Sequence, residues 1–286
     1  RDSIMEMAEG FISRLFSEIL GRDIPVPLPR MKYTEALERF GSDKPDTRFG
    51  MEITDLTDVV KDCGFGVFTS AIANGGTVRC ITAKSGASTF TRKEIDKLTE
   101  YVKGIGVKGL AYIRWVEDAP NCSFGKFLGE GELDKILAAA GAEKGDVVFI
   151  IADKKNTALT SLGALRLKCA RQLNIIPEGK FNFLWITEFP FFEWNEETQH
   201  WDAMHHPFTM PMDESLQYLD TAPEKVFAKA YDLVLNGTEL SSGSIRITDY
   251  ELQQKMFESL GLTDEEIEAK FGFLVEAYKY LSLIHI

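Results

Sequence analysis

Apolar residues recur at helical spacing over the first part of the chain. This stripe predicts an amphipathic helix over residues 3–20, which Gly21 ends as a C-cap. Prolines at alternate positions over residues 25–29 then force an extended segment, because proline cannot continue a helix. A short helix is expected over residues 34–40, and the polar residues 41–46 that follow predict a turn.

The pattern changes close to residue 50, where strand-like and helix-like segments begin to alternate. Two of the strand-like segments flank Asn-Gly-Gly, which is a hairpin signal. Strands are expected at 66–72, 77–83, 110–116 and 146–152, and helices at 56–63, 91–105, 130–140 and 159–173. Thr91 with Glu94 three residues on is a capping-box pattern that predicts the start of the helix at 91–105. Strands interleaved with helices predict an α+β or α/β unit of about 125 residues, enough for a core of its own.

A third stretch begins near residue 179 and is richer in aromatic residues. Strands are expected at 181–192, 231–236 and 244–247, the last two joined through a Gly/Ser-rich bend, and helices at 249–260 and 263–281. We therefore expect three segments, residues 1–50, 51–178 and 179–280. Residues 281–286 are an apolar stub that we interpret as a non-native or truncated tail, and we expect both ends of the chain to be cut.

Composition narrows the function classes. A hydrophobic content of 44% with 27% charged residues is typical of a globular protein. The net charge of −12 argues against a general basic surface for nucleic acid, so any RNA must meet a local patch. The four cysteines have no CxxC spacing, which favours reduced cysteines of a cytosolic protein over a zinc ribbon. No run approaches the ~18 apolar residues of a membrane span, so no membrane partner is expected.

Two acidic residues near the end of the third stretch are candidate metal ligands. Asp232 and Glu239 can offer the hard oxygen atoms that Mg²⁺ prefers. Residues seven apart on an ideal strand face opposite sides, but a bulge at Gly237 would turn Glu239 to the face of Asp232. The alternative is that Asp232 caps a strand and Glu239 lies in a solvated loop.

Basic residues of the same stretch are candidates for anion binding. Arg246 lies between two isoleucines of an expected strand, and an arginine on the inner face of a strand needs an anionic partner, either a ligand or a structural carboxylate. Adjacent histidines point in different directions, so His205 and His206 are not expected to share a metal. His200 has no cysteine nearby in sequence, which argues against zinc. Either histidine of the pair can also be an ordinary hydrogen-bonded loop residue.

Six blocks in order carry a family resemblance: RFGSDKPDTRFGMEITD (39–55), TRKEIDKLTEYVKGIGVKGLAYI (91–113), GALRLK (163–168), FLWITEFPFFEW (183–194), DAMHHPFTMP (202–211) and YDLVLNGTELSSGSIRI (231–247). Together they resemble the bacterial type of aspartyl-tRNA synthetase, a class II enzyme. The resemblance implies an α+β fold: an antiparallel-sheet catalytic domain, residues 1–50 and 179–280, interrupted by an α/β GAD insertion domain, residues 51–178.

The resemblance also implies a function for the parent protein. It would ligate L-aspartate to tRNA through an ATP-derived aspartyl-adenylate, with Mg²⁺, as a cytoplasmic homodimer. It implies that His205 and Arg246 bind aspartate, that Glu239 binds ATP, and that Asp232 and Glu239 hold the metal; His206 would support them. No catalytic residue is assigned. A non-catalytic, tRNA-associated GAD-type binding module is the alternative, and a modest lysine-rich face over residues 93–108 is either solvated or in contact with RNA.

The resemblance points to parts that lie outside the chain. The first two signature motifs of class II synthetases are expected before Arg1 and the third after residue 280, so the isolated chain is expected to be inactive. Residues 163–166 imitate the Gly-x-x-Arg pattern of the third motif, but they lie within an expected helix. We therefore reject that interpretation and expect Arg166 at the surface or in a salt bridge. The GSDKPD block, with Asp43, Lys44 and Asp46, is expected to form a rigid junction.

Overall fold

The computed structural model describes residues 1–116 and 118–284, and within the last helix it excludes the side chains of residues 274 and 278–284. The chain forms two compact units. Unit 1 contains Arg1–Thr34, Phe183–Val234 and the chain from Glu239 onward, and unit 2 contains Glu35–Asn182 and Leu235–Thr238. The units thus divide the chain after Thr34 and Asn182, and the domain boundaries expected near residues 50 and 178 stay a prediction.

Unit 2 contains a five-stranded sheet in the order β2-β3-β6-β4-β5. The strands are β2 (Thr54–Asp55), β3 (Thr77–Ala83), β4 (Ala111–Arg114), β5 (Asn121–Cys122) and β6 (Val147–Asp153). All of these described pairs are antiparallel. The expectation of an α/β insertion is therefore wrong, because helices between strands do not by themselves make the strands parallel; unit 2 is α+β.

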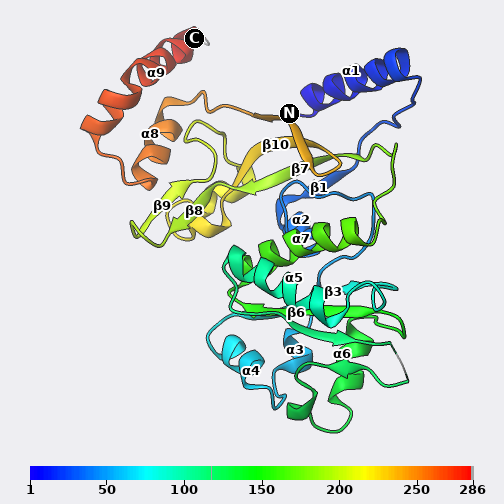
Figure 1. The fold of residues 1–286 in the computed structure, drawn as a ribbon. Helices are drawn as coiled ribbons and strands as arrows, with labels where there is room; N and C mark the ends of the chain where they lie inside the picture. The colour runs from blue at the N-terminus through cyan, green and yellow to red at the C-terminus, as the bar shows by residue number, and fades with distance from the viewer. Residues whose placement is uncertain (117, 285–286) are drawn as a thin grey trace. The chain divides into compact units, whose positions relative to one another are not determined.

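Helices cover both faces of this sheet (Figure 1). One core contains α5 (Arg92–Ile105) and α7 (Lys155–Gln172), and the other contains α3 (Thr57–Val60), α4 (Gly66–Ala73) and α6 (Glu132–Ala139). Successive strand residues alternate between the two cores, so that Ile81 and Phe149 join the first while Cys80 and Ile150 join the second. Burial on both faces explains why the central strand reads as an uninterrupted apolar run.

The strand predicted at 66–72 is wrong, because this segment is the helix α4. Its aromatic and β-branched residues suggested a strand, but Phe68 anchors it by packing against the ring of Phe124, at a centroid distance of 5.0 Å. Asn74 donates from Nδ2 to the carbonyl of Ser70 at 2.7 Å, so Asn-Gly-Gly ends a helix here and does not form a hairpin turn. The strand predicted at 77–83 is confirmed as β3.

The helices predicted from capping signals are confirmed. The backbone N–H of Glu94 donates to the Thr91 hydroxyl at 3.4 Å and opens α5. Gly21 adopts a left-handed conformation, φ 60°, and closes α1 (Asp2–Leu20). The helix α2 (Tyr33–Phe40) ends before Gly41, as expected.

Unit 1 contains a four-stranded sheet in the order β1-β7-β10-β11. Its strands are β1 (Arg30–Lys32), β7 (Phe183–Pro190), β10 (Phe227–Leu235) and β11 (Thr238–Ser244). β1 pairs with β7 in parallel, so the sheet departs from the antiparallel pattern at one edge. A separate ribbon pairs β8 (Phe192–Asn195) with β9 (His200–Ala203), and the chain ends in α8 (Tyr250–Ser259) and α9 (Asp264–Ile284).

Only part of the apolar stripe of α1 is buried. Met5 and Ile12 are buried, and the buried carboxylate of Glu9 accepts a hydrogen bond from the Trp185 indole at 2.9 Å. Met7 and Phe11, in contrast, are 67% and 65% exposed. Most of the stripe that predicted the helix therefore does not enter the core of this chain.

The predicted tail, residues 281–286, lies partly outside the described residues. The backbone of residues 281–284 continues α9, which extends past the predicted helix end. Among the described helices, none combines the length and the hydropathy that crossing a membrane requires.

Candidate functional site

The predicted site residues lie on and around the hairpin of β10 and β11. Asn236 and Gly237 connect the two strands with φ values of 53° and 87°. Positive φ at both central residues is the mark of a two-residue type I′ turn, which Asn-Gly favours. The strand predicted at 244–247 is therefore wrong, because the chain already reverses at this turn and β11 occupies Thr238–Ser244.

The turn determines which side of the hairpin carries the two acidic residues. A two-residue loop sets Leu235 opposite Thr238 and Val234 opposite Glu239. Since Asp232 and Val234 share a face, Asp232 and Glu239 are diagonal neighbours on one face, where such pairs have Cα atoms about 7–8 Å apart. The bulge expected at Gly237 is thus a turn. By this argument the turn has the effect on facing that the bulge was expected to have, and the joint role of the two carboxylates stays a prediction. Asp232 is buried and Glu239 is exposed.

This pair fits Mg²⁺ in its chemistry. Mg²⁺ is usually held by one or two carboxylates together with water and substrate phosphates. Within the part of the chain that the structure describes, no group of three or more His, Cys, Asp or Glu side chains is placed to hold a metal ion. A cation between Asp232 and Glu239 would therefore need its remaining ligands from a phosphate ligand and water.

The tight packing of the hairpin depends on a residue that sequence analysis missed. A Cβ atom on Gly243 would lie 2.6 Å from the ring of Tyr231, so a larger residue at this position of β11 would force the ring to shift. Tyr231 is buried and packs edge-on against Trp185 at a centroid distance of 5.8 Å. The glycine therefore lets β11 lie close over an aromatic pair of the sheet.

Arg246 lies just after β11 and not in a strand. It forms an isolated antiparallel bridge with Thr209, and the Met210 N–H donates to the Ile245 carbonyl at 2.7 Å. Its side chain is exposed, and its Nη1 atom contacts the imidazole of His206. The segment around residue 209 therefore holds Arg246 in place.

The two histidines have different surroundings. His205 is exposed and packs edge-on against Phe189, with ring centroids 4.8 Å apart. His206 is half-buried, contacts Arg246, and lies 3.3 Å from the Thr209 hydroxyl through Nδ1. The structure thus brings His206 to Arg246, a pairing that the sequence did not indicate.

Electrostatics keep His206 neutral. Burial lowers the pKa of His206, and the charges of Arg246 and His205 lower it further. A neutral imidazole can accept a hydrogen bond from a guanidinium. His206 therefore orients Arg246 without adding a second positive charge beside it.

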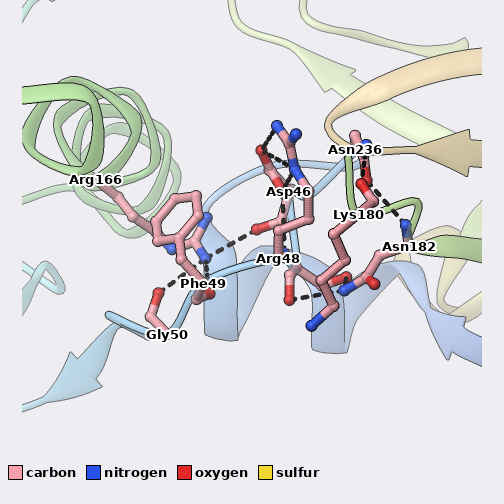
Figure 2. Close-up of polar contacts among 9 residues, drawn as sticks. Asp46, Arg48, Phe49, Gly50, Arg166, Lys180, Asn182 and Asn236 are labelled. Carbon is pink, nitrogen blue, oxygen red and sulfur yellow. Dashed lines mark hydrogen bonds and ion pairs between the residues drawn. The ribbon is translucent and has the colours of Figure 1, made fainter. Parts of the chain in front are cut away.

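Arg166 is a structural residue, but the expectation that it lies at the surface or in a salt bridge is wrong. It is 1% exposed, and its guanidinium lies 4.0 Å from the centroid of the Phe49 ring (Figure 2). Instead of a carboxylate, four backbone carbonyls accept its hydrogen bonds, with distances of 2.9–3.1 Å: those of Asp46, Phe49, Gly50 and Met51. Burial lowers the pKa of Arg166 to about 10, so it stays charged at neutral pH.

Asp46, at the end of the GSDKPD block, is held by hydrogen bonds, whereas the role of the block as a rigid junction stays a prediction, since residues 41–46 lie within unit 2. Asp46 is 3% exposed and accepts three hydrogen bonds from the Arg48 side chain, at 3.0 Å from Nε to Oδ1, 3.2 Å from Nε to Oδ2 and 2.7 Å from Nη2 to Oδ2. Burial opposes ionisation of Asp46, but hydrogen bonds from Arg48 outweigh burial and lower the pKa of Asp46. Asp46 is therefore bound through both its side chain and its carbonyl.

Two lysines of the lysine-rich face over residues 93–108 form ion pairs with glutamates, which supports a solvated face more than a surface in contact with RNA. Lys97 binds Glu94 at 2.6 Å, and Lys103 binds Glu100 at 2.8 Å. These are helical pairs at i,i+3 that partly neutralise the face.

Comparisons with known proteins identify the family of the chain. The family model described as tRNA synthetases class II (D, K and N) matches residues 1–285. Aspartate--tRNA ligase of Ruminiclostridium cellulolyticum is 55% identical over 280 residues, which are 98% of this chain and 47% of the relative. Aspartate--tRNA ligase of Clostridium perfringens (strain ATCC 13124) is 53% identical over 281 residues, again 98% and 47%. Aspartate--tRNA(Asp/Asn) ligase of Bacillus mycoides is 49% identical over 280 residues, with the same shares. The chain spans about half the length of these curated relatives, and it belongs to the class II tRNA synthetase (D, K and N) family.

Proposed function

We propose that the full-length protein ligates L-aspartate to tRNA, through an aspartyl-adenylate made from ATP. The observation that carries the proposal is the hairpin, which presents Asp232 and Glu239 on one face and leads directly to Arg246. The names of the relatives support it. In the same proposal the protein is a cytoplasmic homodimer, as is usual in the family.

The residues of this chain would divide the work of adenylate formation. A guanidinium can bind a carboxylate through two parallel hydrogen bonds, so Arg246 is suited to the side chain of aspartate. The contact with His206 holds the guanidinium for that bond, and His205 borders the same pocket in this proposal. The aspartate α-carboxylate then attacks the α-phosphate of ATP, and pyrophosphate leaves.

Negative charge on the phosphates must be neutralised during this step. Asp232 and Glu239 are the residues that would hold Mg²⁺, and Glu239 would also face ATP. When bound, Mg²⁺ would stabilise the charge on the phosphate oxygens. The two carboxylates orient the phosphate chain in this way and do not take part in bond making.

The arginines of the second and third signature motifs are not among the blocks found in this chain. We therefore propose that the 286-residue chain by itself has little or no activity. An aspartate-dependent ATP–pyrophosphate exchange assay tests this, and robust turnover by the purified chain would contradict it.

The role of Arg246 is tested in the full-length protein. Arg246→Ala removes a bidentate, charge-assisted contact, so kcat/KM for aspartate in the exchange assay should fall by about a hundredfold or more. Arg171→Ala, at an exposed position in α7, is the matched control and should leave the kinetics unchanged. Unchanged kinetics in Arg246→Ala would remove this residue from the aspartate pocket.

A GAD-type binding module without chemistry is the second candidate. The two cores of unit 2 support an independently folded module. The pairing of Lys97 and Lys103 with glutamates reduces the positive charge that this face of α5 offers to RNA. The module is therefore better understood as a part of the ligase than as its whole function.

A further inference from the structure

The tip of the β10–β11 hairpin is bound by polar contacts that sequence analysis did not anticipate (Figure 2). Asn236 donates from Nδ2 to the Lys180 carbonyl at 2.8 Å, and its Oδ1 accepts from the backbone N–H of Asn182 at 2.9 Å. The Asn236 N–H also donates to the Asn182 carbonyl at 3.3 Å. The side-chain amide of one turn residue thus binds two separate backbone groups.

The contacts continue from Asn182 to the GSDKPD segment. Asn182 donates from Nδ2 to the Thr47 carbonyl at 3.1 Å. Next to it, a Cβ atom on Gly237 would lie 3.3 Å from the Cβ of Asp46, so the turn lies directly against this segment. The tip is therefore held by both hydrogen bonds and close packing.

The segment that receives the tip is itself held by hydrogen bonds. Arg166 binds its carbonyls at residues 46, 49, 50 and 51, as described above. Buried and fully hydrogen-bonded polar groups of this kind rigidify their surroundings. The tip of the hairpin is thus connected to α7 through ordered groups at every step.

We propose that Asn236 is a positioning residue that fixes Glu239 and Asp232 for ATP and Mg²⁺. Glu239 lies three residues after Asn236 and Asp232 lies four residues before it, so a loose tip would shift both carboxylates. Arg246 lies ten residues after Asn236 and is held separately by its bridge to Thr209 and its contact with His206. Asn236 should therefore affect ATP and the metal much more than aspartate. The inference rests on the proposed function of the two carboxylates.

The test uses Asn236→Gly in the full-length protein. Glycine keeps the positive φ of the turn and removes only the side-chain amide. The matched control is Asn174→Gly, because Asn174 has the same φ of 53°, is exposed, lies in the same unit, and has no side-chain hydrogen bond among the described residues. Both variants are assayed by pyrophosphate exchange, below their unfolding temperatures, against ATP, MgCl₂ and aspartate in turn.

Small displacements of groups that bind a reacting substrate cost one to two orders of magnitude. We expect Asn236→Gly to raise the KM for ATP and the half-saturating Mg²⁺ concentration by roughly five- to fiftyfold, with the KM for aspartate within about twofold. Asn182→Ala, which loses only the bond to Thr47, should shift the same two quantities less. Asn174→Gly should shift neither.

Two outcomes would overturn the inference: Asn236→Gly behaving like Asn174→Gly, or an equal rise in the KM for aspartate. Glu239→Gln separates this failure from failure of the proposed function. If Glu239→Gln leaves the ATP and Mg²⁺ dependence unchanged, the carboxylate role itself is wrong. If Glu239→Gln raises both and Asn236→Gly does not, only the positioning role is wrong.

Discussion

Arg166→Met should destabilise unit 2 strongly, although the side chain touches no proposed substrate. Methionine is similar in length and apolar, so it fills much of the space without creating a large cavity. It cannot donate to the four carbonyls that Arg166 binds. Two of these acceptors, on Asp46 and Phe49, belong to buried residues and would lose their donor without access to water.

The magnitude follows from opposing contributions. Two buried acceptors without a donor cost about 1–3 kcal/mol each. The loss of the desolvated cation–π contact with Phe49 adds about 1–2 kcal/mol. Removing the buried charge offsets part of this loss in the free energy of unfolding, because burial disfavours the charged form of Arg166 and lowers its pKa. We expect a net loss of about 3 kcal/mol in the free energy of unfolding of unit 2.

Amide hydrogen exchange in β6 (Val147–Asp153) measures this loss, since these buried central amides exchange through opening of unit 2. A loss of about 3 kcal/mol accelerates their exchange by about a hundredfold. Arg171→Met, at an exposed position in the last turn of α7, should change it by less than about threefold. Equal exchange in the two variants would refute the role assigned to the Arg166 hydrogen bonds.

Three further predictions concern packing and pH. Gly163→Ala places a Cβ 2.5 Å from a backbone oxygen and should lower the free energy of unfolding, measured with urea, by up to about 3 kcal/mol. In the control Gly104→Ala the new Cβ meets nothing within 4 Å, and the free energy of unfolding should rise by up to about 1 kcal/mol. Equal unfolding midpoints in the two variants would contradict this. The lowered pKa of Asp46 means that its contribution is complete above about pH 4 and is lost as pH falls through the folded-state pKa, so Asp46→Asn should flatten the acid unfolding curve in that range. The lowered pKa of His206 means that the folded state resists protonation. In the full-length protein the KM for aspartate should therefore still be constant at about pH 6.5, the ordinary histidine pKa, and should rise only as pH falls through the lowered pKa, where protonated His206 repels Arg246. His206→Asn should remove that rise.

Local signals in the sequence predicted most of the helices and strands. Thr91 with Glu94, and Gly21 after its helix, specify ends through bonds between near neighbours, and both predictions are confirmed. The segment 66–73 shows the limit of such signals. Its residues favour a strand, but contact with Phe124, far along the chain, decides for a helix.

The sequence predicted which residue types form the site better than it predicted which of these residues contact one another. The acidic pair shares a face because of the Asn236-Gly237 turn, and Asn-Gly is a signal that the sequence contains. The contact between Arg246 and His206 depends instead on how the segment around Thr209 crosses the end of β11, and no local pattern encodes that crossing. The positioning role proposed for Asn236 is of the same long-range kind.

Arg166 shows that the sequence can indicate a long-range contact without identifying its partners. Leu159, Leu162, Cys169 and Ala170 precede or follow it at helical spacing, and all of them are buried, so periodicity places Arg166 on the buried side of its helix. A buried guanidinium must have acceptors, which the sequence therefore predicts. The sequence does not predict which acceptors these are, because they are backbone carbonyls 115–120 residues away and every residue has such a group. A charged residue at an apolar helix position should accordingly be interpreted first as a binder of backbone, and only then as a surface residue or half of a salt bridge.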